Sequence, residues 1–288
     1  MDTASGATQQ RDLRTGTPVW LARGLPRIPC TPLDDSRDVD VAIVGAGVSG
    51  ALVADALLQA GQTVAVLDRR GPIRGSTAAS TALLQFELDQ PLSLLVSKIG
   101  RARAVRAYWR SATAVDYLHG RITDLGLRCR FKERRTVYLP GNVLNTAQLR
   151  AEASLRAEVG LRSRFIDRDQ LQVLTGVDRA GAILSAGAAE TDPVRMVAGL
   201  WRSALARGCR LHAPVEVTDI ASNRRGVTLS TDGGHELHAK HVVLATGYEL
   251  AKLVKIRGHK VISTWAMATK PQPDRLWPSR QAMFDLLI

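Results

Sequence analysis

One stretch near the start of the chain constrains its fold more than any other. Residues 39–44 and 62–68, VDVAIV and QTVAVLD, are short apolar runs typical of buried strands, and the segment between them has the pattern of a helix that ends at Gly61. The helix would carry four apolar side chains on one face, Leu52, Val53, Ala56 and Leu57. A strand, a helix and a second strand in this order predict one βαβ unit of an α/β fold.

The turn between the first strand and the helix has the spacing GxGxxG, made by Gly45, Gly47 and Gly50. The first glycine permits a tight turn, the second lets the backbone approach a pyrophosphate, and the third lets helix and strand pack closely. Val48 and Ser49 begin the helix, whose N-terminus offers N–H groups and a partial positive charge to phosphates. The pattern favours a dinucleotide site over a glycine turn without a ligand.

The second strand ends in an acidic residue, Asp68, which follows Gly47 by 68 − 47 = 21 residues. At this spacing a carboxylate can accept hydrogen bonds from a ribose diol. An acid here favours FAD or NAD over NADP, because the ribose of NADP carries a phosphate. Asp68 alone does not separate FAD from NAD.

The loop after Asp68, RRGPIRGSTAASTALLQ, is rich in Arg, Gly, Ser and Thr and does not begin a second helix-and-strand repeat. At this point the chain resembles the FAD-dependent oxidoreductases of the D-amino-acid oxidase superfamily, which includes glycine oxidase and sarcosine oxidase. In that family the matching loop runs beside the pyrophosphate and under the flavin ring. The residues that match it are Arg69, Arg70, Gly75, Ser76, Thr77, Ala79 and Ser80. By itself, STAAST could instead be a helix N-cap.

Three later segments match the same family in the same order, so that the resemblance covers about Val39 to Thr269. ETDPVRMVAGLWRSALARGCRL resembles the helix that returns the chain to the cofactor domain. In APVEV, Val215 matches a valine whose backbone N–H and C=O pair with the adenine edge, although a plain strand valine would look the same. HVVLATGYE resembles the ATG motif, in which the glycine turns the strand end beneath the cofactor. Its matching residues are Ala245, Thr246 and Gly247.

The resemblance implies an α/β fold with a GxGxxG-type, Rossmann-like FAD-binding domain and an interleaved mixed-sheet substrate domain. The expected boundaries are an extended, partly disordered N-terminal arm over 1–37, a discontinuous FAD-binding domain over 38–90 and 187–248, and an incomplete substrate domain over 91–186 and 249–288.

The implied reaction is oxidation of a C–N bond in a small-molecule amine or amino acid by hydride transfer to the flavin, with no catalytic residue assigned. Two alternatives stay open. One is a non-catalytic FAD-binding remnant, and the other is an NAD-dependent dehydrogenase.

Further patterns predict individual elements. A helical region from Pro91 to about Leu125 breaks at Gly100, and a helix is capped by Asn145 with Gln148. Strands on either side of a turn at residues 232–234 predict a β-hairpin. Three aromatic side chains of the long helical region are expected in the core, Tyr108, Trp109 and Tyr117.

The formal net charge of +12 is spread over dispersed arginines, which indicates a solvated basic surface and no specific nucleic-acid partner. The three cysteines, Cys30, Cys129 and Cys209, are far apart and odd in number, so we expect neither disulfides nor a cysteine metal site. This usage fits a reducing cytoplasm. No signal peptide and no membrane insertion are expected. We expect no metal site at His235, His238 and His241, because their spacing of three in a strand alternates between faces.

The chain ends in RLWPSRQAMFDLLI soon after STWAMATKP, which resembles a strand of the family's substrate-side sheet. Thr264 and Trp265 would line the substrate pocket or pack in the core. Relatives continue through further strands, so we expect a C-terminally truncated member of the family. Its incomplete sheet edge would be covered by a partner or a second copy, and it would bind FAD weakly.

Overall fold

The computed structural model describes residues 7–8, 16–22, 24–34, 38–249, 252 and 281–284. The chain divides into two compact units. Unit 1 comprises Met1–Thr81, Leu125–Cys129 and Asp192–Trp265, and unit 2 comprises Ala82–Asp124, Arg130–Thr191 and Ala266–Ile288.

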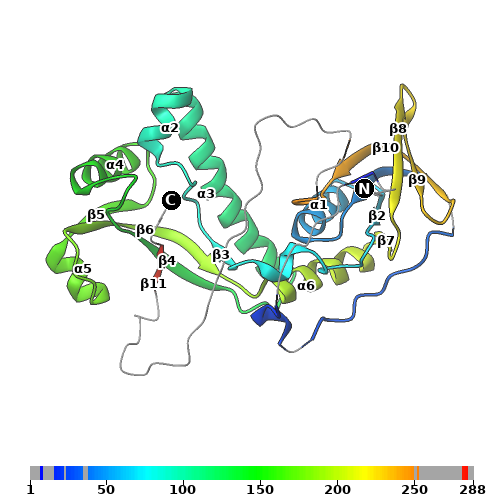
Figure 1. Cartoon of the computed structure of the whole chain (residues 1–288), viewed down its shortest axis with the longest axis horizontal. Helices are drawn as coiled ribbons and strands as arrows, with labels where there is room; N and C mark the ends of the chain where they lie inside the picture. The colour runs from blue at the N-terminus through cyan, green and yellow to red at the C-terminus, as the bar shows by residue number, and fades with distance from the viewer. Residues whose placement is uncertain are drawn as a thin grey trace. The chain divides into compact units, whose positions relative to one another are not determined.

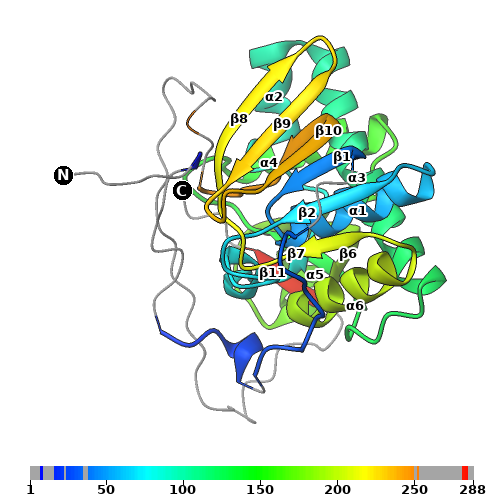
Figure 2. The same ribbon diagram turned by 90° about the vertical axis from the view of Figure 1, so that its right-hand side faces the viewer.

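Unit 1 contains a six-stranded sheet in the order β7-β2-β1-β10-β9-β8 (Figures 1 and 2). Strand β1 is parallel to both β2 and β10, and the hairpin partners β9 and β10 are antiparallel, as are β8 and β9. The predicted βαβ unit and hairpin are therefore confirmed. The bounds are β1 Val39–Val44, α1 Val48–Gln59, β2 Val64–Leu67, α6 Pro193–Ala206, β7 Arg210–His212, β8 Val217–Asn223, β9 Gly226–Thr231 and β10 Glu236–Leu244.

Helix α1 packs through a different face from the apolar one seen in its sequence. Its buried residues are Gly50, Ala51, Ala54 and Asp55, whereas Ala56 is exposed. Small side chains let the helix lie close to the sheet, and a Cβ on Gly50 would collide with the carbonyl oxygen of Gly45. The carboxylate of Asp55 is buried because it is paired with Arg207 at the end of α6.

Unit 2 is built on a sheet in the order β11-β4-β6-β3, with β5 paired to β6 (Figure 1). The break at Gly100 is confirmed, with a φ of +82°, and so is the capping box of Asn145 and Gln148. The sequence did not predict β5, α5 or β6. The bounds are β3 Leu83–Leu84, α2 Leu92–Ile99, α3 Arg101–Asp124, β4 Lys132–Tyr138, α4 Thr146–Glu158, β5 Ser163–Asp167, α5 Arg168–Thr175, β6 Gly181–Glu190 and β11 Gln281–Phe284.

The expectation that three aromatic residues of α3 lie in the core holds for one of them. Tyr108 is fully buried, but Trp109 and Tyr117 are 43% and 51% exposed. Only one side of this long helix faces its unit, and the ring of Trp109 lies at the edge, where its Nε1–H donates to the carbonyl of Val159 at 2.9 Å. None of the helices in the described part of the chain is long and apolar enough to cross a membrane.

Residues near both ends of unit 1 make backbone contacts. The N–H of Ala7 donates to the carbonyl of Val217 at 2.9 Å, and the carbonyl of Ala7 accepts from Lys252 N at 2.8 Å. The N-terminal arm also contains the short 3-10 helix η1, Val19–Leu21. Thr264 and Trp265 lie outside the described residues, while β11 pairs in parallel with β4.

Candidate functional site

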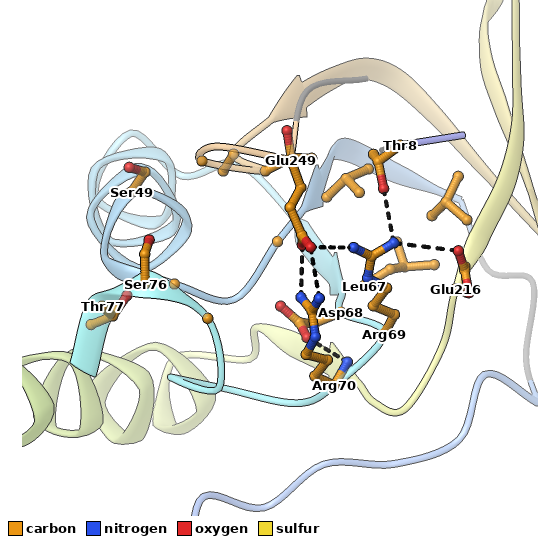
Figure 3. A pocket seen from close by; sticks show the side chains of 18 of the residues that line it. Thr8, Ser49, Leu67, Asp68, Arg69, Arg70, Ser76, Thr77, Glu216 and Glu249 are labelled. Atoms are coloured by element: carbon orange, nitrogen blue, oxygen red, sulfur yellow. Dashed lines mark hydrogen bonds and ion pairs between the residues drawn. The ribbon is translucent and has the colours of Figure 1, made fainter. Parts of the chain in front are cut away.

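A pocket of about 770 Å³, counted to its mouth, opens in unit 1 where β1, β2 and β10 reach their carboxyl ends (Figure 3). Open α/β sheets bind ligands at this edge. Most of the predicted site residues line it: Gly45, Gly47, Val48, Ser49, Asp68, Arg69, Arg70, Gly75, Ser76, Thr77, Val215, Ala245, Thr246 and Gly247.

Three predicted residues do not line the pocket. Gly50 acts instead in the close packing of α1, and Ala79 and Ser80 lie at the end of the 3-10 helix η2, Ser76–Ala79. The carbonyl of Ser80 accepts from the Nε1–H of Trp20 at 2.8 Å. The lining residues that sequence reasoning missed are Thr8, Val44, Leu67, Glu216, Val217 and Glu249.

The glycine turn is locked against the end of β10. Gly45 has a φ of +112°, and a Cβ there would lie 2.5 Å from the carbonyl oxygen of Ala245. A hydrogen bond joins the same two segments, because Ala245 N donates to the carbonyl of Val44 at 2.8 Å, and Gly45 N joins the turn to the end of β2 by donating to the carbonyl of Leu67 at 2.8 Å. The first glycine and the ATG strand end therefore form one backbone surface.

A threonine side chain closes the N-terminus of α1. The Oγ1 of Thr77 accepts from the N–H of Val48 at 3.0 Å, and Thr77 is buried. A Cβ on Gly47 would lie 3.1 Å from this oxygen, which is tighter than ordinary contact. The glycine turn and the Ser/Thr loop thus depend on each other.

The carboxylate of Asp68 joins the glycine turn to the loop that follows β2. Its Oδ2 accepts from Ala46 N at 2.7 Å, and its Oδ1 accepts from the N–H groups of Arg70 and Gly71 at 2.8 Å each. An ionised carboxylate has about four acceptor positions. Three are used, so one is left for a ligand hydroxyl.

The pairing of Val215 with an adenine edge stays a prediction. In this structure the N–H of Val215 donates to the carbonyl of Asp68 at 3.0 Å. The sequence pattern shows the valine but not this contact between loops distant in the chain. Val215 still lines the pocket together with Glu216 and Val217.

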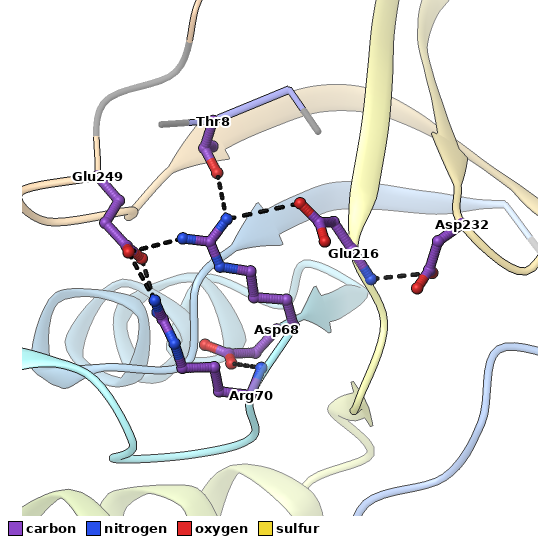
Figure 4. Close-up of polar contacts among 7 residues, drawn as sticks. Thr8, Asp68, Arg70, Glu216, Asp232 and Glu249 are labelled. Atoms are coloured by element: carbon purple, nitrogen blue, oxygen red, sulfur yellow. Dashed lines mark hydrogen bonds and ion pairs between the residues drawn. The ribbon is translucent and has the colours of Figure 1, made fainter. Parts of the chain in front are cut away.

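Both arginines after Asp68 are held by Glu249 (Figures 3 and 4). Arg70 donates to the two carboxylate oxygens at 2.7 and 2.6 Å, and Arg69 Nη2 lies 2.6 Å from Oε1. Arg69 Nη1 also contacts Thr8 at 3.3 Å and Glu216 at 3.5 Å. The hydrogen bonds to Glu249 raise the pKa of Arg70 above its ordinary value.

A buried tryptophan contacts the middle of the glycine turn. Trp201, on α6, is fully buried, and its Nε1–H donates to the carbonyl of Ala46 at 3.1 Å. The N–H of Ile73 donates to the same oxygen at 3.2 Å. The turn is therefore supported from behind by side chain and backbone.

Comparison with known proteins gives a family. The family model described as FAD dependent oxidoreductase matches residues 40–286. The protein YhfW of Bacillus subtilis strain 168, named for a Rieske 2Fe-2S iron–sulfur centre, is 21% identical over 78% of this chain and 43% of its own length.

Solved structures share the fold. Glycine oxidase of Geobacillus kaustophilus is similar at a TM-score of 0.56 and 24% identity, over 73% of this chain and 55% of that one. L-amino acid deaminase of Proteus vulgaris, with a specific insertion deleted, is similar at a TM-score of 0.63 and 16% identity, over 82% and 59%. The chain thus spans about half the length of these relatives.

Proposed function

The chain belongs to the FAD-dependent oxidoreductase family, and from this premise we propose that the pocket of unit 1 binds FAD for the oxidation of a C–N bond in an amine or amino acid. The observation that carries the proposal is the convergence of the glycine turn, the Asp68 carboxylate and the ATG strand end on one pocket. Each of these parts has a counterpart in dinucleotide recognition.

The residues present fit the cofactor. We assign the pyrophosphate to the N-terminus of α1 and to the loop at residues 75–77, because both segments line the pocket and the helix end favours anions. We assign the ribose to Asp68, whose remaining acceptor position can take a hydroxyl hydrogen.

The adenine is assigned to the segment 215–217, all three residues of which line the pocket. Arg69 and Arg70 then belong to the adenosine end of the pocket. Glu249 holds their guanidinium groups there instead of leaving them free for phosphate.

We also propose that unit 1 is the FAD-binding domain and that unit 2 belongs to the substrate domain. Relative to the expected boundaries, this division moves residues 82–90 and 187–191 into the substrate domain and Glu249 into the FAD-binding domain. Bound FAD supplies an acceptor for a hydride from the substrate carbon, which leaves an imine that water hydrolyses. The residues of the pocket bind and orient the cofactor. A reducing cytoplasm is the proposed compartment, since Cys30, Cys129 and Cys209 are free thiols.

The test is the cofactor content of the purified full chain. We expect bound or added FAD to give a saturable flavin spectrum, and NADH to bind at least about tenfold more weakly. Gly47→Val should abolish FAD binding, because the side chain would displace Thr77 and fill the closest approach to the pyrophosphate.

Gly141→Val is the matched control, because a Cβ at Gly141 meets no atom within 4 Å. Tighter binding of NADH than of FAD would favour the dehydrogenase alternative and overturn the proposal. Anaerobic mixing with amino acids and N-methyl amines then tests the reaction. FAD binding without reduction by any substrate would favour the non-catalytic alternative.

A further inference from the structure

A second cavity lies wholly within unit 2 and shares no residue with the first. It is partly open to solvent, and the space that it offers is about that of one water molecule. Its walls come from the segment after β3, from β4 and from α4, and the lining residues are Gln85, Glu87, Leu88, Pro91, Thr136, Tyr138 and Arg156.

Three charged side chains are buried at this cavity. Arg156 and Glu87 are 2% and 8% exposed, and Glu152, one turn before Arg156 on α4, is fully buried. Arg156 Nε donates to Glu152 Oε1 at 2.7 Å. Charged groups are rarely buried this completely, and each one needs hydrogen-bond partners.

Glu152 is fully provided with partners. Besides Arg156, the N–H groups of Leu92 and Ser93 donate to its two oxygens at 2.8 Å each. These are N–H groups at the start of α2, where a negative charge is favourable. The carboxylate of Glu152 therefore needs nothing from the cavity.

The side chains of Glu87 and Arg156 each have one polar atom without a hydrogen-bond partner among the described residues. Glu87 Oε1 accepts from Thr136 Oγ1 at 2.5 Å, but its Oε2 is buried without a hydrogen-bond partner among the described residues. The same holds for Arg156 Nη1, which lies 3.7 Å from Glu87 Oε1, too far for a hydrogen bond. One acceptor and one donor are thus left over, both on residues that line the cavity.

The charges decide what can occupy this position. An anion would meet the carboxylate of Glu87 and, behind it, that of Glu152. A cation would leave Arg156 Nη1 without a partner, because it supplies no acceptor. A molecule without net charge that both donates and accepts a hydrogen bond satisfies the two free atoms together.

We propose that this cavity is a binding site for one small uncharged molecule that accepts from Arg156 Nη1 and donates to Glu87 Oε2. Water and primary amides share this chemistry. The site is independent of FAD and of the reaction proposed above.

A crystal structure of the full chain, grown without small amides and then soaked in acetamide, tests the proposal. We expect a water within 3.2 Å of Glu87 Oε2 and Arg156 Nη1. If the site also binds primary amides, acetamide should replace this water after the soak. Water that acetamide does not displace assigns the site to solvent and supports the proposal. An empty cavity, or a direct hydrogen bond between Glu87 Oε2 and Arg156 Nη1, would overturn it.

Solution binding and one isosteric variant separate this chemistry from a nonspecific hollow. In ligand-observed NMR titrations, any acetamide binding should exceed that of acetone, which cannot donate, by about tenfold, and acetate should bind least. Glu87→Met removes the acceptor at nearly the same side-chain volume and should remove the water or amide density, whereas Glu133→Met, on an exposed side chain of the same unit, should not. Preference for acetate, or unchanged density in Glu87→Met, would contradict the proposal.

Discussion

The two cavities hold their polar groups in opposite ways. In unit 1 the Asp68 carboxylate binds three backbone N–H groups, and Arg69 and Arg70 are both paired with Glu249. In unit 2 Glu152 binds two backbone N–H groups and Arg156, but one oxygen of Glu87 and one nitrogen of Arg156, which meet other side chains, have no partner in the described structure. A backbone framework can be rigid before a ligand arrives, whereas a side-chain cluster with two unsatisfied atoms depends more on its occupant.

The largest expected effect comes from breaking the cluster of unit 2. Arg156→Met leaves the carboxylates of Glu152 and Glu87 buried without their cation, so the free energy of unfolding should fall by about 3–5 kcal/mol. Urea denaturation followed by circular dichroism measures it. Arg101→Met is the control, because its partner Glu158 is exposed, and it should cost at most about 1 kcal/mol. Equal losses in the two variants would show that the cluster contributes no more than a surface pair.

The glycine turn of unit 1 should respond to a single methyl group. Gly45→Ala forces an alanine into a positive φ and against the carbonyl of Ala245, so we expect a loss of at least about 3 kcal/mol in the same assay. Gly61→Ala has a positive φ of +74° but no atom within 4 Å, and should cost only about 1–2 kcal/mol. If both variants lose the same amount, the contact with β10 does not restrain the turn.

Asp68→Ala tests whether the backbone framework also serves the ligand. The variant should bind FAD more weakly by about 1.5–3 kcal/mol, the usual value of a hydrogen bond to a charged group. Equilibrium titration followed by flavin fluorescence gives the two dissociation constants. Asp40→Ala, on β1 of the same unit but absent from the pocket, should leave FAD affinity unchanged. Unchanged affinity in Asp68→Ala would place the ribose contact elsewhere.

Acid should weaken the cluster of unit 2 through Glu152. Burial raises the pKa of this carboxyl, but the charge of Arg156 and the hydrogen bonds from Ser93 and Arg156 outweigh burial, so its pKa is lowered. A carboxyl whose pKa is lower in the folded than in the unfolded state stabilises the fold. This stabilisation is complete at pH values above the ordinary carboxyl pKa of about 4.3 and is lost as the pH falls through the folded-state pKa.

Glu152 can change the free energy of unfolding by at most about 1.4 kcal/mol per pH unit. Unfolding free energies measured below pH 5 should therefore fall less steeply in Glu152→Gln, while Glu133→Gln keeps the steepness of the wild type. A slope that Glu152→Gln leaves unchanged would assign the acid sensitivity to other carboxyls.

Much of unit 1 could be predicted because its signals are local. The GxGxxG turn, Asp68 and the ATG strand end are short patterns whose residues act through backbone conformation. The role of Glu249 is different, since it contacts Arg70 across 179 positions of sequence and the ATG pattern beside it does not predict this pairing. The use of the Val215 N–H by Asp68 was missed for the same reason.

The cluster of unit 2 gives no comparable signal. Glu87, Thr136 and Arg156 come from three distant segments, and isolated charged residues in a sequence usually indicate an exposed face. Strand β6, GAILSAGAAE, was missed because it is buried on both faces and so lacks the alternation that indicates a strand.

Because Trp201 contacts the glycine turn, its fluorescence can report on this part of the pocket. Its ring is shielded from water, and its N–H is bonded to the carbonyl between the first two glycines, so its emission depends on the state of that turn. A flavin bound at the turn would absorb this emission by energy transfer. Cofactor occupancy could then be followed in the unlabelled protein, with Trp201→Phe to identify the part of the signal that comes from this position.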